Sequence, residues 1–220
     1  MRRLVVLRPE PGARKTVARA KARGLDAIAV PLFEIEPIAW EPPEVSVFDG
    51  LLLTSANAVR HGGEQIRALS GMPVYAVGEA TADAARDAGL EVAATGDLGV
   101  DALLNSIDPD LTLLHPCGED RREASGASQR ITSIPVYRAN AIEADFSGIE
   151  GVVALIHSPR AGRRFAELVR DRKSIAVAAI SAVAAEAVGS GWQTVEAVEQ
   201  PTDDALLALA ARLCNNPPPK

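Results

Sequence analysis

The sequence contains few aromatic residues and only two cysteines. Phe, Trp and Tyr make up 4% of the 220 residues, whereas hydrophobic residues make up 47% and are mostly Ala, Val and Leu. A core with so few rings must be built from small aliphatic side chains, as expected where helices pack on a parallel sheet. Cys117 and Cys214 have no CxxC partner, which argues against a disulfide framework and against a cysteine-rich zinc site.

Long apolar runs and an excess of positive charge are also absent. The first apolar run, Leu4–Leu7, is too short for the core of a signal peptide, and no stretch approaches the roughly 20 apolar residues of a membrane span. The net charge of −6 argues against a general binder of nucleic acid or of anionic membranes. We therefore expect a cytoplasmic protein with neither kind of partner, in which a local cluster of donors holds any anionic ligand.

Short apolar runs alternate with helical patterns along the whole chain. Because these runs are continuously apolar, they are expected to be strands of parallel sheets covered by helices on both faces. The expected strands cover residues 3–7, 26–30, 48–53, 73–77, 91–95, 111–115, 151–157, 174–180 and 193–198. The expected helices cover residues 12–24, 55–69 with an interruption at 62–63, 79–89, 99–107, 119–129, 159–171, 181–191 and 201–215.

Two extended segments interrupt this alternation. Residues 30–43 carry four prolines, and residues 133–144 form a second extended stretch, so both are expected to be linkers. A complete α/β pattern lies between them, and another pattern surrounds them. The order of elements therefore predicts two α/β domains, the second inserted into the first.

The two halves of this pattern resemble each other. Three blocks align at a single offset, which indicates two related α/β units. The aligned pairs are Ser55 with Ser158, Gly78 with Ser181, and Asp101 with Asp204. A strand-to-helix junction that places hydroxyls and backbone N–H groups at the end of a strand therefore occurs twice. Two facing copies of this junction would form a cleft, and domain interfaces are common places for ligand sites.

Eight segments occur in an order and spacing that resemble the uroporphyrinogen-III synthase family. They read LRPEPGA, VPLFEIEP, FDGLLLTSANAV, YAVGEATADAARDAGL, LLHPCGEDRRE, IPVYRA, VVALIHSPRAGRRFAEL and AISAVAAEAVGSGW…VEQPTDDALLALA. The resemblance implies an α/β fold with two similar, flavodoxin-like parallel-sheet domains joined by a two-stranded β-ladder. It places residues 1–34 and 142–220 in the first domain, residues 38–136 in the second, and the linker strands at 31–37 and 133–141.

The resemblance also implies a reaction. Members of the family cyclise hydroxymethylbilane, a linear tetrapyrrole with eight carboxylates, to uroporphyrinogen III, with inversion of ring D and loss of water. The family needs no metal or organic cofactor, so catalysis must come from positioning and electrostatics. A monomer that receives its substrate from hydroxymethylbilane synthase is expected.

The same resemblance assigns candidate site residues. Tyr137 matches the family tyrosine best placed to act as an acid, although spacing alone favours a packing residue of a linker strand. Arg121, Arg122 and Arg138 are further candidate carboxylate partners, and the first two could instead belong to a solvated helix face. The expected substrate-binding residues are Arg8, Thr54, Ser55, Ala56, Asn57, Gly78, Thr81, Ser158, Pro159 and Arg160.

Several positions depart from the family pattern. Leu7 replaces a threonine, His157 precedes Ser158, and Val183 and Ala184 stand where threonine donors are usual. These departures leave open an alternative, a non-catalytic two-domain ligand-binding or regulatory protein of the same fold. The histidines lack metal-ligand spacing, so no metal site is expected.

Overall fold

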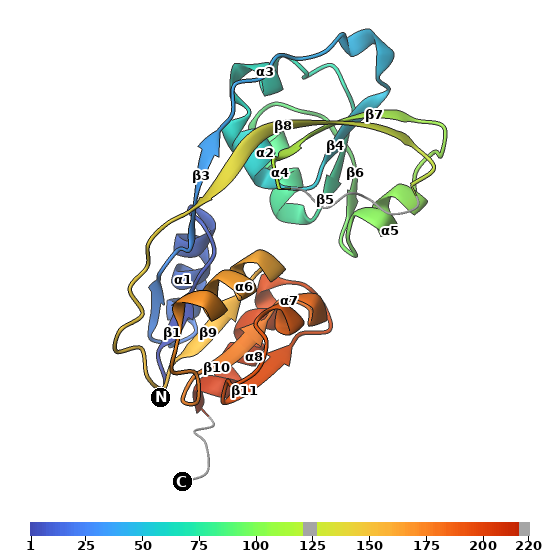
Figure 1. The fold of residues 1–220 in the computed structure, drawn as a ribbon. Helices are drawn as coiled ribbons and strands as arrows, with labels where there is room; N and C mark the ends of the chain where they lie inside the picture. Colours follow the sequence, from blue (N-terminus) through green and yellow to red (C-terminus); the bar gives the residue numbers. More distant parts are fainter. Residues whose placement is uncertain (121–126, 216–220) are drawn as a thin grey trace. The chain divides into compact units, whose positions relative to one another are not determined.

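The computed structural model describes residues 1–120 and 127–215. The chain divides into two compact units (Figure 1). Unit 1 comprises Met1–Glu34 and Ala141–Lys220, and unit 2 comprises Ile35–Asn140. Each unit is built around its own parallel sheet, so the two are described in turn.

The sheet of unit 1 has five strands in the order β11-β10-β9-β1-β2, and every neighbouring pair is parallel. The strands are β1 (Leu4–Val6), β2 (Ala27–Ala29), β9 (Val153–Ile156), β10 (Ala176–Ala179) and β11 (Thr194–Ala197). The helices are α1 (Gly12–Ala22), α6 (Pro159–Leu168), α7 (Ala182–Ala187) and α8 (Asp203–Asn215). Read from β2, this is the flavodoxin-like strand order.

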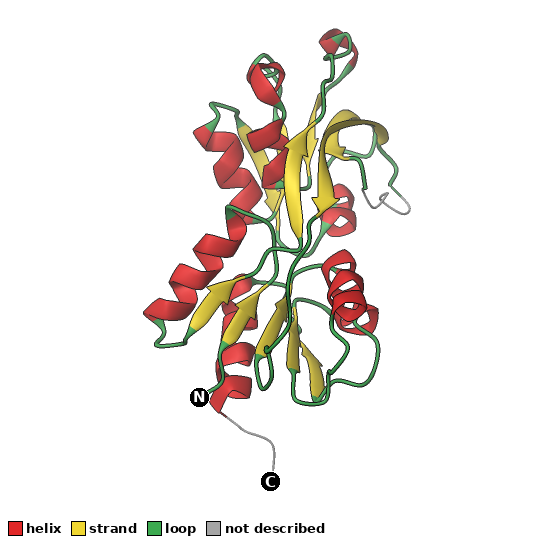
Figure 2. Ribbon diagram, turned by 60° about the vertical axis from the view of Figure 1, so that its left-hand side comes forward, coloured by secondary structure: helices red, strands yellow, loops and turns green. Residues whose placement is uncertain are grey.

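Both faces of this sheet are buried under helices, as the continuous apolar strands predict. Leu4 and Val6 pack into one cluster with Ala20 of α1 and Leu206 of α8. Val5 points to the other face, because successive side chains of a strand alternate, and it too is fully buried. Figure 2 shows helices in red on both sides of the yellow strands.

The sheet of unit 2 has six strands in the order β3-β8-β7-β4-β5-β6. The strands are β3 (Phe33–Pro37), β4 (Gly50–Leu53), β5 (Val74–Val77), β6 (Val92–Gly96), β7 (Thr112–Gly118) and β8 (Arg130–Ala141). The helices are α2 (Ala56–His61), α3 (Gly63–Arg67), α4 (Glu79–Asp87) and α5 (Val100–Asn105), and a 3₁₀ turn, η1, covers Val45–Val47. Leu51 and Leu53 pack with residues of α2, α3 and α4, whereas Leu52 packs with residues of α5.

The internal repeat appears in the topology of the two sheets. The consecutive strands β9, β10 and β11 lie side by side in unit 1, as β4, β5 and β6 do in unit 2. The neighbour of β9 on its other side is β1, and the corresponding neighbour of β4 is β7. The prediction of two similar parallel-sheet α/β units is therefore confirmed.

The two predicted linker strands, β3 and β8, are neighbours in the sheet order. β8 is also longer than predicted and pairs in parallel with β7 along most of that strand, as its continuous yellow ribbon in Figure 1 illustrates. β7 extends to Gly118, whereas the prediction ended this strand at His115, just before Pro116. The register of β7 with β4 ends at Leu114, so Pro116 lies where only β8 is paired and a missing N–H is tolerated.

One predicted helix is not helical in those of its residues that the structure describes. The polar segment 119–129 was expected to be helical, but residues 119–120 and 127–129 are not. Residues 121–126, including Arg121 and Arg122, lie outside the described residues.

Candidate functional site

Each sheet has one point where its strand order reverses, and open α/β sheets bind ligands at the carboxyl ends of the strands at such a point. In unit 1 this point lies between β1 and β9, and in unit 2 it lies between β7 and β4. Arg8 and Ser158 follow the two strands of unit 1, and Thr54 and Ser55 follow β4. Most candidate residues therefore gather at the edge of their own sheet where chemistry is expected.

Ser55 and Ser158 cap the helices that begin at these edges. The Ser55 hydroxyl accepts a hydrogen bond from the Asn57 N–H at 3.2 Å, and the Ser158 hydroxyl accepts one from the Ala161 N–H at 3.2 Å. Both residues have extended backbones, as helix N-caps usually do. The hydroxyls thus fix the turns that present Ala56, Asn57, Pro159 and Arg160.

Thr54 is held by a histidine that the sequence analysis considered only as a metal ligand. His115 Nε2 lies 3.1 Å from the Thr54 hydroxyl, and its Nδ1 lies 3.2 Å from the hydroxyl of Ser133. The imidazole is 5% exposed, so this chain of hydrogen bonds is largely sheltered from water. His115 therefore orients the Thr54 hydroxyl at the end of β4.

Tyr137 belongs to the same edge of unit 2. It lies on β8 opposite Gly118 of β7. Burial raises the pKa of the phenol and the neighbouring Cys117 adds to this, while an interaction with the Ser55 side chain acts in the opposite direction. An ordinary phenol titrates near pH 10, so Tyr137 remains protonated throughout the neutral range.

Gly78 and Thr81 lie at the start of α4. Gly78 has φ of +79°, a conformation that favours glycine, and its N–H donates to the Gly96 carbonyl at 2.8 Å. Thr81 is 5% exposed, so its side chain is enclosed within unit 2. The structure therefore places Gly78 at a strand-to-helix turn, whereas Thr81 is part of the packed helix face.

In unit 1, the two candidate arginines are held in defined positions. The guanidinium of Arg8 lies over α1, where a Cβ on Gly12 would come within 2.5 Å of Arg8 Nε. It also lies 3.6 Å from a carboxylate oxygen of Asp203. Arg160 stacks over the ring of Phe33 at 4.5 Å from its centroid. Both side chains are therefore already held in position by contacts within unit 1.

Asp203, in the first turn of α8, connects several polar groups at this edge of unit 1. Its carboxylate lies 3.1 Å from His157 Nε2, accepts a hydrogen bond from the Thr16 hydroxyl at 3.1 Å, and pairs with Arg19. Burial works against the carboxylate, but the hydrogen bond from His157 and the charge of Arg19 outweigh it and lower its pKa. Sequence reasoning missed this residue, although an acidic first turn after Pro201 was a visible signal.

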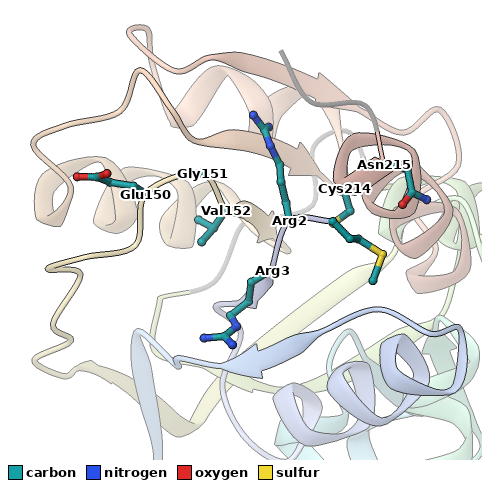
Figure 3. A pocket seen from close by; sticks show the side chains of 8 residues that line it. Arg2, Arg3, Glu150, Gly151, Val152, Cys214 and Asn215 are labelled. Carbon is teal, nitrogen blue, oxygen red and sulfur yellow. The ribbon is translucent and has the colours of Figure 1, made fainter. Parts of the chain in front are cut away.

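The hollow shown in Figure 3 lies at the other end of the unit 1 strands. It measures about 520 Å³ and is lined by residues that precede β1 and β9 and by the end of α8. Arg2 and Arg3 line it but bond to Gln193 and Asp26. No candidate residue lies there.

The described ranges, 1–120 and 127–215, contain neither a metal-binding cluster nor a helix that could span a membrane. No group of three or more His, Cys, Asp or Glu side chains there is arranged to hold a metal ion. No helix in that part of the chain has the length and apolar character needed to traverse a membrane.

Comparison with known proteins identifies the family. The model of the family described as uroporphyrinogen-III synthase HemD matches residues 14–208. The chain belongs to the uroporphyrinogen-III synthase family. A uroporphyrinogen-III synthase of Chlorobaculum parvum is 30% identical over 90 residues, which is 37% of this chain and 37% of that relative. The chain thus spans little more than a third of the length of the curated relative it matches.

Solved structures of uroporphyrinogen-III synthases share the fold. The enzyme from Helicobacter pylori superposes with a TM-score of 0.67 at 16% identity, covering 97% of this chain and 100% of the other. A mutant of the Thermus thermophilus enzyme gives a TM-score of 0.56 at 18% identity, covering 97% and 98%. At such identities the likeness establishes the fold alone.

The departures from the uroporphyrinogen-III synthase pattern have structural explanations. Leu7 is fully buried, so it belongs to the core of unit 1. Ser181 caps α7 by accepting a hydrogen bond from the Ala184 N–H at 3.3 Å, which retains a capped turn without the usual threonines. Val183 is 47% exposed and supplies no polar group, and Arg138 is exposed on β8.

The burial of His157 predicts that the stability of the protein is sensitive to acid. Burial lowers the pKa of His157, with Arg8 adding to the effect and Asp203 opposing it. A depressed folded-state pKa contributes stability that is complete above the unfolded value near 6.5 and is lost as pH falls through the folded value. We expect the free energy of unfolding to fall as pH drops from about 7.5 to about 5.

Denaturant unfolding at several pH values measures this effect. His157→Gln should flatten the decline in this window. His61, whose pKa is lowered by burial and then by Arg60, provides a second contribution from unit 2 that His61→Gln removes. An unchanged pH profile in both variants would contradict the assignment.

Proposed function

We propose that the protein is a uroporphyrinogen-III synthase that converts hydroxymethylbilane to uroporphyrinogen III with inversion of ring D and loss of water. The observation that carries the proposal is membership of the family over residues 14–208. The candidate residues support it, because they provide an acid and several anion-binding groups at the carboxyl edges of their sheets.

Tyr137 is proposed as the acid for the first step. Its protonated phenol gives a proton to the departing hydroxyl, which leaves as water and produces the azafulvene. The substituted carbon of ring D attacks this electrophile to form the spiro intermediate, which fragments and recloses with ring D inverted. The final loss of a proton from the reclosed ring returns one to the phenolate, so Tyr137 ends the cycle as it began.

The carboxylates of the substrate are proposed to meet two kinds of donor. Arg8 and Arg160 supply charge at the edge of unit 1, and backbone N–H groups near Thr54–Asn57 and Ser158–Arg160 supply hydrogen bonds. Asp203 already neutralises part of the Arg8 charge at 3.6 Å. Because the chain carries a net charge of −6, these local donors must outweigh a general repulsion.

The apparent affinity for the substrate should therefore depend on salt. We expect kcat/KM to fall several-fold between about 0.05 and 0.5 M NaCl, because ions screen exposed charge pairs. Arg160→Gln should reduce this dependence. Arg170→Gln provides a matched control, since Arg170 is exposed just beyond the other end of α6. Equal salt dependence in the wild type and both variants would contradict the role of Arg160.

The cellular compartment, the oligomeric state and the source of the substrate are also proposals. The protein would act in the cytoplasm as a monomer and receive hydroxymethylbilane directly from hydroxymethylbilane synthase. Sedimentation of the purified protein, alone and mixed with that synthase, measures both the oligomeric state and any complex. A stable dimer of the protein alone would contradict the monomer.

A coupled assay tests the proposed activity. Porphobilinogen and its deaminase generate hydroxymethylbilane in the presence of the purified protein, and chromatography of the oxidised products separates the isomers. An active synthase yields the type III isomer. A protein that only binds the tetrapyrrole leaves the type I isomer formed by spontaneous closure.

A further inference from the structure

We propose that Gly118 is a positioning residue for Tyr137: its lack of a side chain seats the phenol at the carboxyl edge of the unit 2 sheet. The inference rests on the proposed function of Tyr137 as the acid. No sequence pattern indicates this role, because Gly118 lies in the segment LLHPCGED, 19 positions before Tyr137.

The geometry of the pair leaves no space for a larger residue. Gly118 and Tyr137 are register partners of β7 and β8, next to an irregularity in the ladder between Cys117 and Gly118. A Cβ added to Gly118 would lie 2.9 Å from Cζ, 3.0 Å from Cε2 and 3.0 Å from the phenolic oxygen of Tyr137. Glycine within a strand often marks such a close approach by another group.

The hydroxyl end of the ring, and not only its edge, therefore lies over Gly118. Two further contacts define its position. The phenol interacts with the Ser55 side chain, whose own orientation is fixed by the Asn57 N–H, and the His61 ring is centred 6.4 Å from the Tyr137 ring. The Glu119 N–H also donates to the Tyr137 carbonyl at 2.9 Å, which ties the two strands together at this point.

A methyl group at position 118 would force the phenol to move, since the strand backbones are constrained by their neighbours. The phenol would have to leave its present position over Gly118. A displacement of about 1 Å at a catalytic group can cost on the order of 100-fold in rate. The expected loss therefore appears in kcat and in the fraction of type III product, while KM changes little.

The same sheet contains a matched control. A Cβ on Gly50, at the start of β4, would lie 2.8 Å from Cε2 of Tyr75 and 2.8 Å from the Pro73 carbonyl oxygen. Gly50→Ala therefore creates a comparable clash with a tyrosine, at the amino end of the strands and away from the candidate residues. It should destabilise unit 2 without changing kcat or the isomer ratio of the folded fraction.

The experiment measures kcat and isomer ratio for the wild type, Gly118→Ala, Gly50→Ala, Tyr137→Phe and the double variant Gly118→Ala/Tyr137→Phe. We expect Gly118→Ala to lower kcat by about 10–100-fold and to raise the type I fraction. In the Tyr137→Phe background, Gly118→Ala should lower kcat by less than about threefold more, because the phenol that Gly118 positions is already absent. An equal loss in both backgrounds, or a loss no larger than that of Gly50→Ala, overturns the proposal.

A second measurement does not depend on activity. The protein has two tyrosines, so Tyr75→Phe leaves Tyr137 as the sole phenol, and its ultraviolet titration can be followed directly. Gly118→Ala should move that titration towards the ordinary value near 10, because the displaced ring becomes more exposed. An unchanged titration in the folded variant overturns the proposal. Failure of the wild type to form type III product would instead refute the proposed function.

Discussion

Tyr137→Phe should lower turnover of hydroxymethylbilane by about 10²–10⁴-fold, the range usual for a positioned acid. The variant removes the only group at this edge that we assign as proton donor, and it retains the ring that lies over Gly118. Because the ring and its packing remain, the free energy of unfolding should fall by no more than about 1 kcal/mol. Steady-state kinetics and thermal unfolding of the same preparation separate the two effects.

Ser158→Ala is the comparison for this result. Its hydroxyl caps α6, and backbone N–H groups remain after it is removed, so the loss of activity should be smaller than that of Tyr137→Phe. A Phe variant that retains full type III activity would make Tyr137 structural. Departure of the hydroxide would then have to rely on water or on a carboxyl group of the substrate.

Phe165→Ala should produce the largest change in stability, a loss of about 3–5 kcal/mol in the free energy of unfolding. Phe165 on α6 is fully buried, stacks on Trp192 at 5.0 Å between ring centroids, and meets the edge of Phe146 at 5.2 Å. With aromatics at only 4% of the chain, few neighbouring side chains can fill the resulting cavity.

Denaturant unfolding followed by tryptophan fluorescence in a Trp40→Phe background reports on this cluster, because Trp192 is then the sole indole. Phe146→Ala is the control, because Phe146 is only partly buried and makes the outer contact of the three rings. It should destabilise the protein less than Phe165→Ala does. A loss below about 1 kcal/mol in Phe165→Ala would show that the surrounding aliphatic side chains close over the site.

The sequence predicted the fold well because the central strands of each sheet begin as continuous apolar runs, as in Leu4–Val6, Gly50–Leu53 and Val153–Ile156. Val153–Ile156 and Ala176–Ala179 are fully buried in the structure, as such runs require. The end of a strand was predicted less well where a proline lies within the strand. Pro116 ended the predicted strand at His115, yet β7 continues because Pro116 lies beyond the register of β7 with β4, where one side of the strand has no ladder to interrupt.

The candidate site was less predictable, because its supporting contacts join residues far apart in the chain. The repeat indicated both capping serines, since each belongs to a local strand-to-helix junction. His115 and Thr54 are separated by 61 positions, and His157 and Asp203 by 46, and neither pairing has a sequence pattern of its own. Gly118 was equally invisible, since its role depends on a partner in the adjacent strand.

The most direct test of the central claim is the isomer ratio formed from preformed hydroxymethylbilane as the concentration of purified protein is varied. Spontaneous closure supplies the type I isomer as an internal reference in every reaction. The account predicts that the type III fraction rises towards completion with catalytic amounts of protein, and that the rise is delayed by orders of magnitude in Tyr137→Phe. Type I product at every concentration of folded wild-type protein would contradict it.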